Sequence, residues 1–218
     1  MKIGLIHAMT ASVEPIETAF QLAAPEASLV HFMDTGLLPL LQQEESLNET
    51  VIKRVQKLTD AAAESNVDCI QLTCSAFNEL TDILQPFYTI KLFRSDEAML
   101  DQALQYERIG FISTVNETPP VLESYVKNKN ANIAVKTLID TKALDYLLKK
   151  DKQTHDERIT KLVKEMESQA DVIVLTQYSM AHVAKEITDV SIPILTGPEE
   201  SVKRCLHYIK AKGGYEND

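Results

Sequence analysis

The stretch Asp68–Phe77 reads DCIQLTCSAF, and a closely similar stretch, Asp171–Met180, reads DVIVLTQYSM. In each, an aspartate precedes a short apolar run, and the run is followed by Leu-Thr and then by a polar pair. Buried strands of parallel sheets have this continuous apolar character. The two stretches therefore predict equivalent strands in two similar halves of the chain. They differ in one chemical respect, because Cys74 follows the first threonine and Gln177 follows the second.

Apolar runs rich in β-branched residues alternate with helical stretches along the rest of the chain. Strands separated by helices indicate parallel strands joined by crossovers, so the sequence predicts an α/β fold. The expected strands are Ile3–Ile6, Ser28–Phe32, Cys69–Thr73, Tyr88–Leu92, Arg108–Ser113, Asn132–Thr137, Asp171–Thr176 and Ile192–Thr196. The expected helices include Glu14–Leu22, Glu45–Ser65, Ala76–Leu84, Ser95–Leu104, Pro120–Lys127, His155–Gln169, Met180–Ile187 and Glu199–Lys212.

Other landmarks recur in the same order in both halves. Ile3–Ile6 matches Ile109–Ile112, and Pro15-Ile16 matches Pro120-Val121, at a slowly drifting offset. We interpret this as a duplicated unit, which predicts two similar parallel-sheet domains related by a pseudo-two-fold axis. Ligands of open parallel sheets bind beyond the carboxyl ends of the strands. The two halves are therefore expected to share an active site in the cleft between them, with Cys74 and Gln177 on opposite sides of one ligand.

The composition excludes several classes of function. The net charge of −10 argues against a nucleic-acid partner, which needs a basic surface. No apolar run approaches the roughly 20 residues that cross a bilayer, and the start of the chain does not resemble a secretory signal. An odd number of cysteines without regular spacing is typical of a reducing compartment, so we expect a cytoplasmic protein without membrane partners. No spacing typical of metal ligands or of nucleotide phosphate loops is present, so neither a metal nor a nucleotide is expected.

Five motifs together resemble the aspartate/glutamate/hydantoin racemase superfamily, in particular its branch with a TCSAF-type motif. The resemblance implies two similar α/β domains, which we place at residues 1–95 and 96–198, with a final helix over 199–218 that packs back on the first domain. It also implies carbon-acid chemistry without a cofactor, in a site between the domains. The motifs are IGLIHAM (Ile3–Met9), TCSAF (Thr73–Phe77), DEAM (Asp96–Met99), THDER (Thr154–Arg158) and LTQYSMA (Leu175–Ala181).

In racemases of this superfamily, one thiol on each domain flanks the substrate carbon. Cys74 falls on the first of these positions and is the predicted catalytic acid or base, whereas Gln177 falls on the second. Because an amide neither takes nor gives a proton at useful pH, a symmetrical two-thiol reaction is in doubt. A helix starting after Cys74 is expected to lower the pKa of its thiol, and the alternative is a buried structural cysteine. Cys69 and Cys205 are expected to lie in the core.

Residues at the start of the two helices that follow these strands are predicted to bind the substrate. Ser75 and the backbone of Ala76 are expected to hold a carboxylate, and Ser179 is its counterpart. Helix capping by the two serines is the alternative. Gln177 is expected to orient a substrate oxygen, and the hydroxyl of Tyr178 is a candidate second acid, although its reference pKa of about 10 makes it a poor base.

Three further positions complete the predicted site. His155, in a Thr-x-x-Glu capping-box pattern that begins at Thr154, is a candidate proton donor, with a surface position as the alternative. His7 ends the first strand and is expected to contact the substrate, unless backbone groups satisfy it. Thr114 lies in the equivalent loop of the second half and is expected to position the substrate, with an ordinary turn as the alternative.

These residues predict an isomerase of the racemase or epimerase type that acts on the α-carbon of a small carboxylate, such as an amino acid or a hydantoin. Cys74 is its acid or base, and Tyr178 or His155 is the second acid. A decarboxylase or carbon–carbon lyase with a single thiol is the first alternative, and Gln177 favours it. A metabolite-binding protein without activity is the second alternative. A homodimer is expected only because two-fold dimers are the commonest oligomers.

Overall fold

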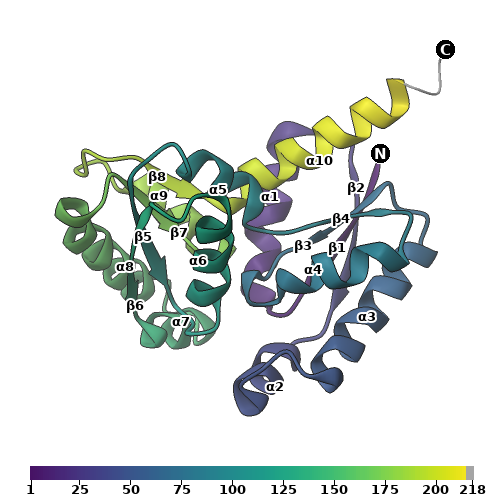
Figure 1. The fold of residues 1–218 in the computed structure, drawn as a ribbon, viewed down its shortest axis with the longest axis horizontal. Coiled ribbons are helices and arrows are strands. Elements are labelled where there is room, and N and C mark those ends of the chain that lie inside the picture. The colour runs from purple at the N-terminus through teal and green to yellow at the C-terminus, as the bar shows by residue number, and fades with distance from the viewer. Residues whose placement is uncertain (215–218) are drawn as a thin grey trace. The chain divides into compact units, whose positions relative to one another are not determined.

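The computed structural model describes residues 1–214, and the chain divides into two compact units (Figure 1). The first unit is Met1–Ser95 together with the described residues from Pro198 onward, and the second is Asp96–Gly197. The last helix, α10 (Gly197–Gly214), covers most of the predicted final helix, whose remaining residues 215–218 lie outside the described part of the chain. Within residues 1–214, no helix combines the length and the apolar character that spanning a membrane requires.

The first unit contains a parallel sheet in the order β2-β1-β3-β4. The buried central strands are β1 (Lys2–His7) and β3 (Cys69–Leu72), and every residue of β3 is buried because helices cover the sheet. The outer strands are β2 (Ser28–Met33) and β4 (Lys91–Phe93). The helices are α1 (Val13–Ala23), α2 (Leu37–Glu44), α3 (Glu49–Glu64) and α4 (Glu79–Leu84), together with α10.

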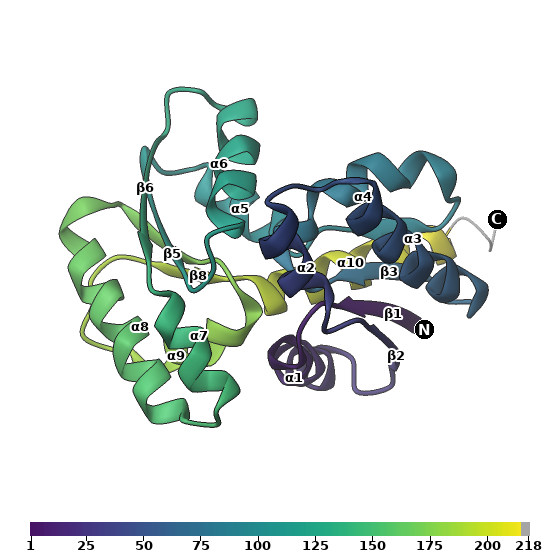
Figure 2. The same cartoon turned by 90° about the horizontal axis from the view of Figure 1, so that it is seen from below.

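The second unit contains a parallel sheet in the order β6-β5-β7-β8. Its strands are β5 (Arg108–Ser113), β6 (Ala134–Ile139), β7 (Val172–Leu175) and β8 (Ile194–Thr196). Its helices are α5 (Glu97–Ala103), α6 (Thr118–Lys129), α7 (Thr141–Leu148), α8 (Lys152–Met166) and α9 (Ala181–Glu186). The helices α7 and α8 lie side by side, as Figures 1 and 2 both show.

The two units share one order of elements and one order of strands. In each, a strand and a helix are followed by a second strand, two consecutive helices, a third strand and helix, and a fourth strand. The register also agrees, because Ile3 pairs with Cys69 in the first sheet and Ile109 pairs with Val172 in the second. The predicted α/β fold with two similar parallel sheets is confirmed.

The repeated aspartate has a structural role in both units. The carboxylate of Asp68 accepts a hydrogen bond of 2.8 Å from the backbone N–H of Lys2, at the start of β1. Asp171 accepts one of 2.9 Å from the backbone N–H of Arg108, at the start of β5, and also pairs with the Arg108 guanidinium. Each aspartate therefore closes the amino-terminal end of two neighbouring strands, where the ladder leaves an N–H without a strand partner.

The repeated threonine closes the opposite end. The hydroxyl of Thr73 donates to the backbone carbonyl of Ile6 at 3.1 Å, and Thr176 donates to that of Ile112 at 3.0 Å. The aspartate and the threonine that the two stretches share thus bond to the neighbouring strand at equivalent positions in the two units. The residue after each threonine is not part of these contacts, and it is a thiol in the first unit, Cys74, and an amide in the second, Gln177.

Several predicted boundaries were wrong. The helix predicted over Glu45–Ser65 begins at Glu49, because Asn48 caps it by accepting from the N–H groups of Thr50 and Val51. The separate helix α2 precedes it, and α2 and α7 were missed. A strand was predicted over Tyr88–Leu92, but the observed strand is Lys91–Phe93. The side-chain amide of Gln85 donates hydrogen bonds to the carbonyls of Tyr88 and Ile90, so a side chain takes the place of a strand partner at these carbonyls.

The predicted capping box at Thr154 was also wrong. Helix α8 begins at Lys152, and Asp151 caps it by accepting from the N–H of Thr154 at 3.1 Å. The Thr154 hydroxyl donates to the same carboxylate at 2.8 Å. His155 therefore lies inside the first turn of α8 and not at its boundary.

We expect Gly110→Ala to destabilise the protein more than the equivalent change Gly4→Ala. A Cβ at Gly110 would lie 2.4 Å from Cγ and 2.7 Å from Sδ of the fully buried Met166, whereas the nearest atom at Gly4 is 3.3 Å away. Overpacking of this kind costs about 1–3 kcal/mol, a fall of several degrees in Tm. Thermal denaturation of the two variants tests this, and equal Tm values would contradict it.

Candidate functional site

Cys74 follows β3 and Thr73 directly and has extended backbone angles of φ −125° and ψ 113°. All three cysteines carry free thiols, but Cys69 and Cys205 are fully buried whereas Cys74 is half-buried. The hydrogen bond between Cys205 and Cys69, together with burial, raises the pKa of the Cys205 thiol well above its ordinary value. Of the three thiols, only that of Cys74 is therefore within reach of a dissolved ligand.

Cys74 borders a small apolar pocket within the first unit. The pocket wall carries no charged side chain, and its volume of about 10 Å³ is roughly what one water molecule needs. The other residues that line it are Ile6, Ala8, Leu37, Val55, Leu72 and Phe77.

The helix predicted over Ala76–Leu84 is divided in two. Ser75–Phe77 form a single turn of 3-10 helix, and α4 begins only at Glu79 with Asn78 as its N-cap residue. The side chain of Asn78 makes no capping hydrogen bond to α4, and the side chains of Ser75 and Ala76 are buried. The lowering of the Cys74 thiol pKa by the helical turns that follow it stays a prediction.

His7 lies at the end of β1, is fully buried and has protein partners on both ring nitrogens. Its Nδ1 lies 2.8 Å from the hydroxyls of both Ser12 and Thr73, and its Nε2 lies 3.0 Å from Nδ1 of His31. The His31 ring stacks on the His7 ring at 5.2 Å and meets the carboxylate of Glu17 at 3.3 Å. Contact of His7 with a substrate stays a prediction, but the ring is fully hydrogen-bonded without one.

The protonation of His7 follows from its neighbours. The Ser12 hydroxyl donates to the carbonyl of Met9, and the Thr73 hydroxyl donates to that of Ile6. The two hydroxyls also lie 2.9 Å from each other, so each of them can donate to the other, to its carbonyl or to Nδ1. Both tautomers of the neutral His7 ring are compatible with these hydrogen bonds. Burial, and next the charge of His31, lower the pKa of His7 to about 4, so the neutral ring is the stable form.

This pKa predicts a loss of stability in acid. Because the folded-state pKa of about 4 lies below the reference value of about 6.5, the unfolded chain binds more protons between these values. The contribution of His7 is therefore complete above pH 6.5 and is lost as the pH falls towards 4, up to about 3 kcal/mol. Urea denaturation near pH 7 and pH 4.5 should show a smaller loss for His7→Gln than for the wild type. Equal losses would contradict the prediction.

Gln177 takes the position of Cys74 in the second unit, with φ −118° and ψ 145°. Its Oε1 accepts from the backbone N–H of Thr114 at 2.9 Å and from the Thr114 hydroxyl at 3.3 Å, and its Nε2 donates to the Ser113 hydroxyl at 2.9 Å. The amide thus fixes the loop after β5, and its carbonyl oxygen is occupied. Substrate contact by Gln177 and Thr114 stays a prediction.

Tyr178 and Ser179 follow Gln177 in a 3-10 turn, Tyr178–Met180, and both are buried. The Ser179 hydroxyl has no hydrogen-bond partner in the described structure. It does not cap α9, so the capping alternative does not explain it. A buried hydroxyl without a partner is uncommon and is available to a ligand.

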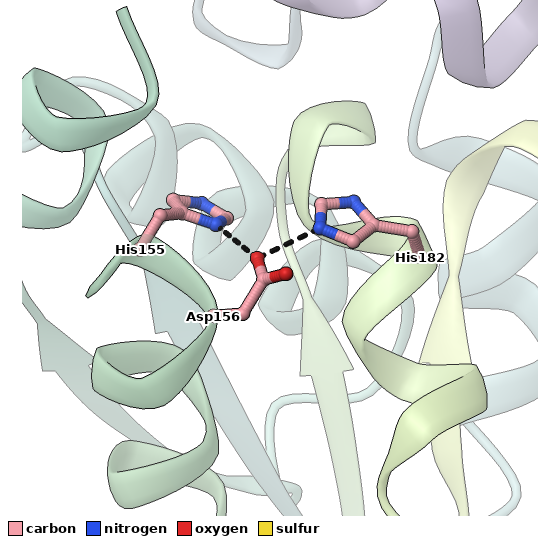
Figure 3. A group of neighbouring side chains, drawn as sticks. All are labelled: His155, Asp156 and His182. Atoms are coloured by element: carbon pink, nitrogen blue, oxygen red, sulfur yellow. Dashed lines mark hydrogen bonds and ion pairs between the residues drawn. The ribbon is translucent and has the colours of Figure 1, made fainter. Parts of the chain in front are cut away.

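His155 meets Asp156 and His182 in the second unit (Figure 3). His155 is fully buried, and its Nδ1 lies 2.6 Å from Oδ1 of Asp156. His182, on α9, brings Nε2 to 2.7 Å from the same oxygen, and the two rings stack at 5.8 Å. The sequence pattern identified His155 but missed His182, because nothing in the spacing of an isolated helical histidine indicates a partner on another helix.

The charges in this cluster are fixed by its hydrogen bonds. Burial lowers the pKa of His155, so its ring is neutral. Burial alone would raise the pKa of Asp156, but the hydrogen bonds from His155 and His182 hold it below its ordinary value. Asp156 is therefore a carboxylate that accepts two imidazole N–H groups on one oxygen, and Nε2 of His155 is left buried without a partner.

The family description Asp/Glu/Hydantoin racemase matches residues 3–205 of the chain. No curated protein matches it in sequence. Solved structures that share its fold at low sequence identity include three racemases. An allantoin racemase from Klebsiella pneumoniae has a TM-score of 0.75 at 17% identity and covers 97% of this chain and 89% of its own.

A glutamate racemase from Francisella tularensis has a TM-score of 0.76 at 14% identity, with 97% of this chain and 81% of its own covered. An aspartate racemase from Picrophilus torridus has a TM-score of 0.73 at 14% identity, with 96% and 94% covered. These three structures establish the fold over nearly the whole chain.

Proposed function

Because this chain belongs to the Asp/Glu/Hydantoin racemase family, we propose that it is a racemase or epimerase that works without a cofactor on the α-carbon of a small carboxylate. The observation that carries the proposal is the placement of Cys74. It is the one cysteine of three that is not fully buried, and it ends a central strand at the edge where open parallel sheets bind ligands.

Cys74 acts as base or acid in this proposal. As a thiolate it takes the α-proton, and the electron pair of the C–H bond moves into the carboxylate or carbonyl to give an enolate-like intermediate. Return of a proton to the other face inverts the centre and regenerates the carboxylate. The backbone N–H groups at Ser75 and Ala76 are proposed to stabilise the negative charge on the substrate oxygens.

A second proton donor is needed, because Gln177 has no titratable proton and its carbonyl oxygen is engaged by Thr114. We propose His155 or Tyr178 for this role. Tyr178 is supported by its position directly after Gln177. His155 donates its Nδ1–H to Asp156, so its partnerless Nε2 is a base that can serve as the donor only after it has taken up a proton. The hydroxyl of Ser179, which also lacks a partner, is proposed to contact the substrate.

Proton NMR in D2O with pooled carboxylates tests the proposal. The pool contains single enantiomers of amino acids, hydantoins, hydroxy acids and substituted malonates. Loss of an α-proton signal without a new compound is the expected result, and Cys74→Ala should prevent it. Cys205→Ala is the matched control, because it removes a thiol that is buried. Unchanged spectra across the whole pool would contradict the proposal and favour a binding protein.

A lyase is the second candidate, and Gln177 is the observation that favours it. Decarboxylation or carbon–carbon cleavage produces a carbanion that needs one proton on one face, which Cys74 alone can supply. The same spectra separate the two reactions, because a lyase gives a new compound that carries deuterium at the former reaction centre. A racemase gives back the starting compound, deuterated and of mixed configuration.

A further inference from the structure

The cluster of His155, Asp156 and His182 has the composition of a metal site, although no ligand spacing along the chain predicted one. Two imidazole nitrogens approach a single carboxylate oxygen, at 2.6 and 2.7 Å, and one ligand atom from each residue lies within 4.8 Å of the others. We propose that these three residues bind a divalent transition-metal cation, with zinc as its probe. The proposal does not require the reaction proposed above, but it removes His155 from the candidate proton donors of that reaction.

The ligand atoms need little movement to accept an ion. Zinc lies about 2.0–2.2 Å from histidine nitrogen and carboxylate oxygen, so tetrahedral ligands lie roughly 3.3 Å from one another. The nitrogen–oxygen distances of 2.6 and 2.7 Å would widen by less than about 1 Å. Each neutral imidazole would carry its proton on the ring nitrogen that faces away from the ion. Figure 3 shows that both of these nitrogens point away from Asp156.

His155 is difficult to explain as a purely structural residue. Its ring is fully buried, its Nδ1 bonds to Asp156, and its Nε2, on the side of the ring away from the proposed ion, has no partner in the described structure. His7 is equally buried but has partners on both ring nitrogens, as expected of a histidine that serves the fold. A buried polar atom without a partner costs stability, and such atoms are concentrated at functional sites.

The site can be reached at Asp156 and has a favourable charge. Asp156 lines a surface depression together with the carboxylates of Glu157 and Glu186, whereas neither histidine lines it. Lys152 is the opposing charge, because its ammonium lies 3.5 Å from Oδ2 of Asp156 and 3.7 Å from Glu186. Lys152 contacts Oδ2 of Asp156, whereas the two imidazoles contact Oδ1.

The donor set selects the kind of ion. Two imidazole nitrogens and one carboxylate oxygen suit Zn²⁺, Fe²⁺, Co²⁺ or Ni²⁺, whereas Mg²⁺ and Ca²⁺ prefer oxygen ligands. Three protein ligands leave at least one position open to water or a ligand. The ion would connect α8 to α9, which pack against each other. With the ion bound, His155 is no longer a candidate acid, and Tyr178 remains for that role.

Zinc titration of the EDTA-treated full chain tests the proposal, with Cys74 alkylated beforehand so that its thiol cannot bind the ion. One zinc ion per chain should bind, and zinc at about 100 times Kd should raise Tm by roughly 5–10 °C. Magnesium at the same concentration should have no effect. Cobalt should give the visible spectrum of a four- or five-coordinate nitrogen and oxygen site.

Four variants assign the site. His182→Ala and Asp156→Asn should each weaken zinc binding by at least about 100-fold, because even residues that only orient a ligand contribute 10–100-fold. His182 is 29% exposed, so its removal is expected to leave the fold intact. Lys152→Ala should tighten binding, and His207→Ala, which changes an exposed histidine of α10, should leave it unchanged.

The absence of stoichiometric binding to the wild type would overturn the proposal. Binding that His182→Ala and Asp156→Asn leave unaltered would also overturn it, because the ion would then lie elsewhere. In either case the cluster would be a hydrogen-bonded network without a metal.

Discussion

Replacement of Cys74 by alanine should reduce α-proton exchange by at least about 1000-fold. The expected size follows from general acid–base catalysis, which contributes about 100- to 10000-fold, with the upper half of that range expected because no other thiol is accessible. Cys74→Ser should also be inactive, since an alcohol is a far weaker acid than a thiol. The rate is measured as loss of the α-proton signal in D2O at saturating substrate.

Cys205→Ala is the control for this result. Cys205 packs against Gln71 at 3.4 Å in the core, so its removal is expected to change stability and leave the rate per folded molecule unchanged. An exchange rate in Cys74→Ala within a factor of ten of the wild type would show that another group removes the proton. The carbon-acid role of Cys74 would then be wrong, whatever the family of the chain.

Alkylation should distinguish Cys74 from the other two cysteines by at least about 100-fold in rate. A half-buried thiol reacts from the folded state, whereas Cys69 and Cys205 must wait for local or global unfolding. Iodoacetamide treatment followed by peptide mass spectrometry gives the three rates separately. A small carboxylate that binds at the site should slow the reaction of Cys74 and leave the other two unaffected.

Equal alkylation of the three cysteines in folded protein would contradict the burial pattern. The pH dependence of the alkylation rate of Cys74 gives a second test, because its midpoint reports the pKa of the thiol. A midpoint below the ordinary thiol value of about 8.5 would support the predicted effect of the following helical turns. A midpoint at the ordinary value, with no protection by any carboxylate, would favour a binding protein.

The duplicated fold could be predicted because its signal is local. Asp68 and Asp171 accept from the first N–H of the neighbouring strand, and Thr73 and Thr176 donate to the carbonyl of its second-to-last residue. Each contact requires one residue type at one end of a strand, so the same residue types recur at equivalent strands in both halves of the sequence. Apolar runs between them are the ordinary pattern of buried parallel strands.

The helices α2 and α7 were missed for physical reasons. The sequence of α2, LLPLLQQE, contains Pro39 in its first turn, where proline is tolerated in a helix although it reads as a breaker. Glu45, which follows α2, has a left-handed conformation with φ 53°, which a pattern of apolar residues does not reveal. The helix α7 has only eight residues and two buried positions, too few for a clear period.

The candidate site was predictable only in part. Cys74 was identified by its place after a strand and by a family motif, both readable along the chain. The roles of His7 and Gln177 depend on contacts with other segments of the chain. Ser12, Thr73 and His31 bond to His7, and the loop after β5 bonds to Gln177. His182 was missed because its partner Asp156 belongs to another helix.

The most direct test of the central claim starts from one enantiomer of the compound that the NMR pool identifies. The wild type in D2O should convert it to the opposite enantiomer carrying deuterium at the α-carbon, and Cys74→Ala should leave both the configuration and the α-proton unchanged. Chiral chromatography with mass spectrometry measures the two together. Inversion with the original α-proton retained, or the same deuterium uptake in Cys74→Ala, would contradict proton transfer by Cys74.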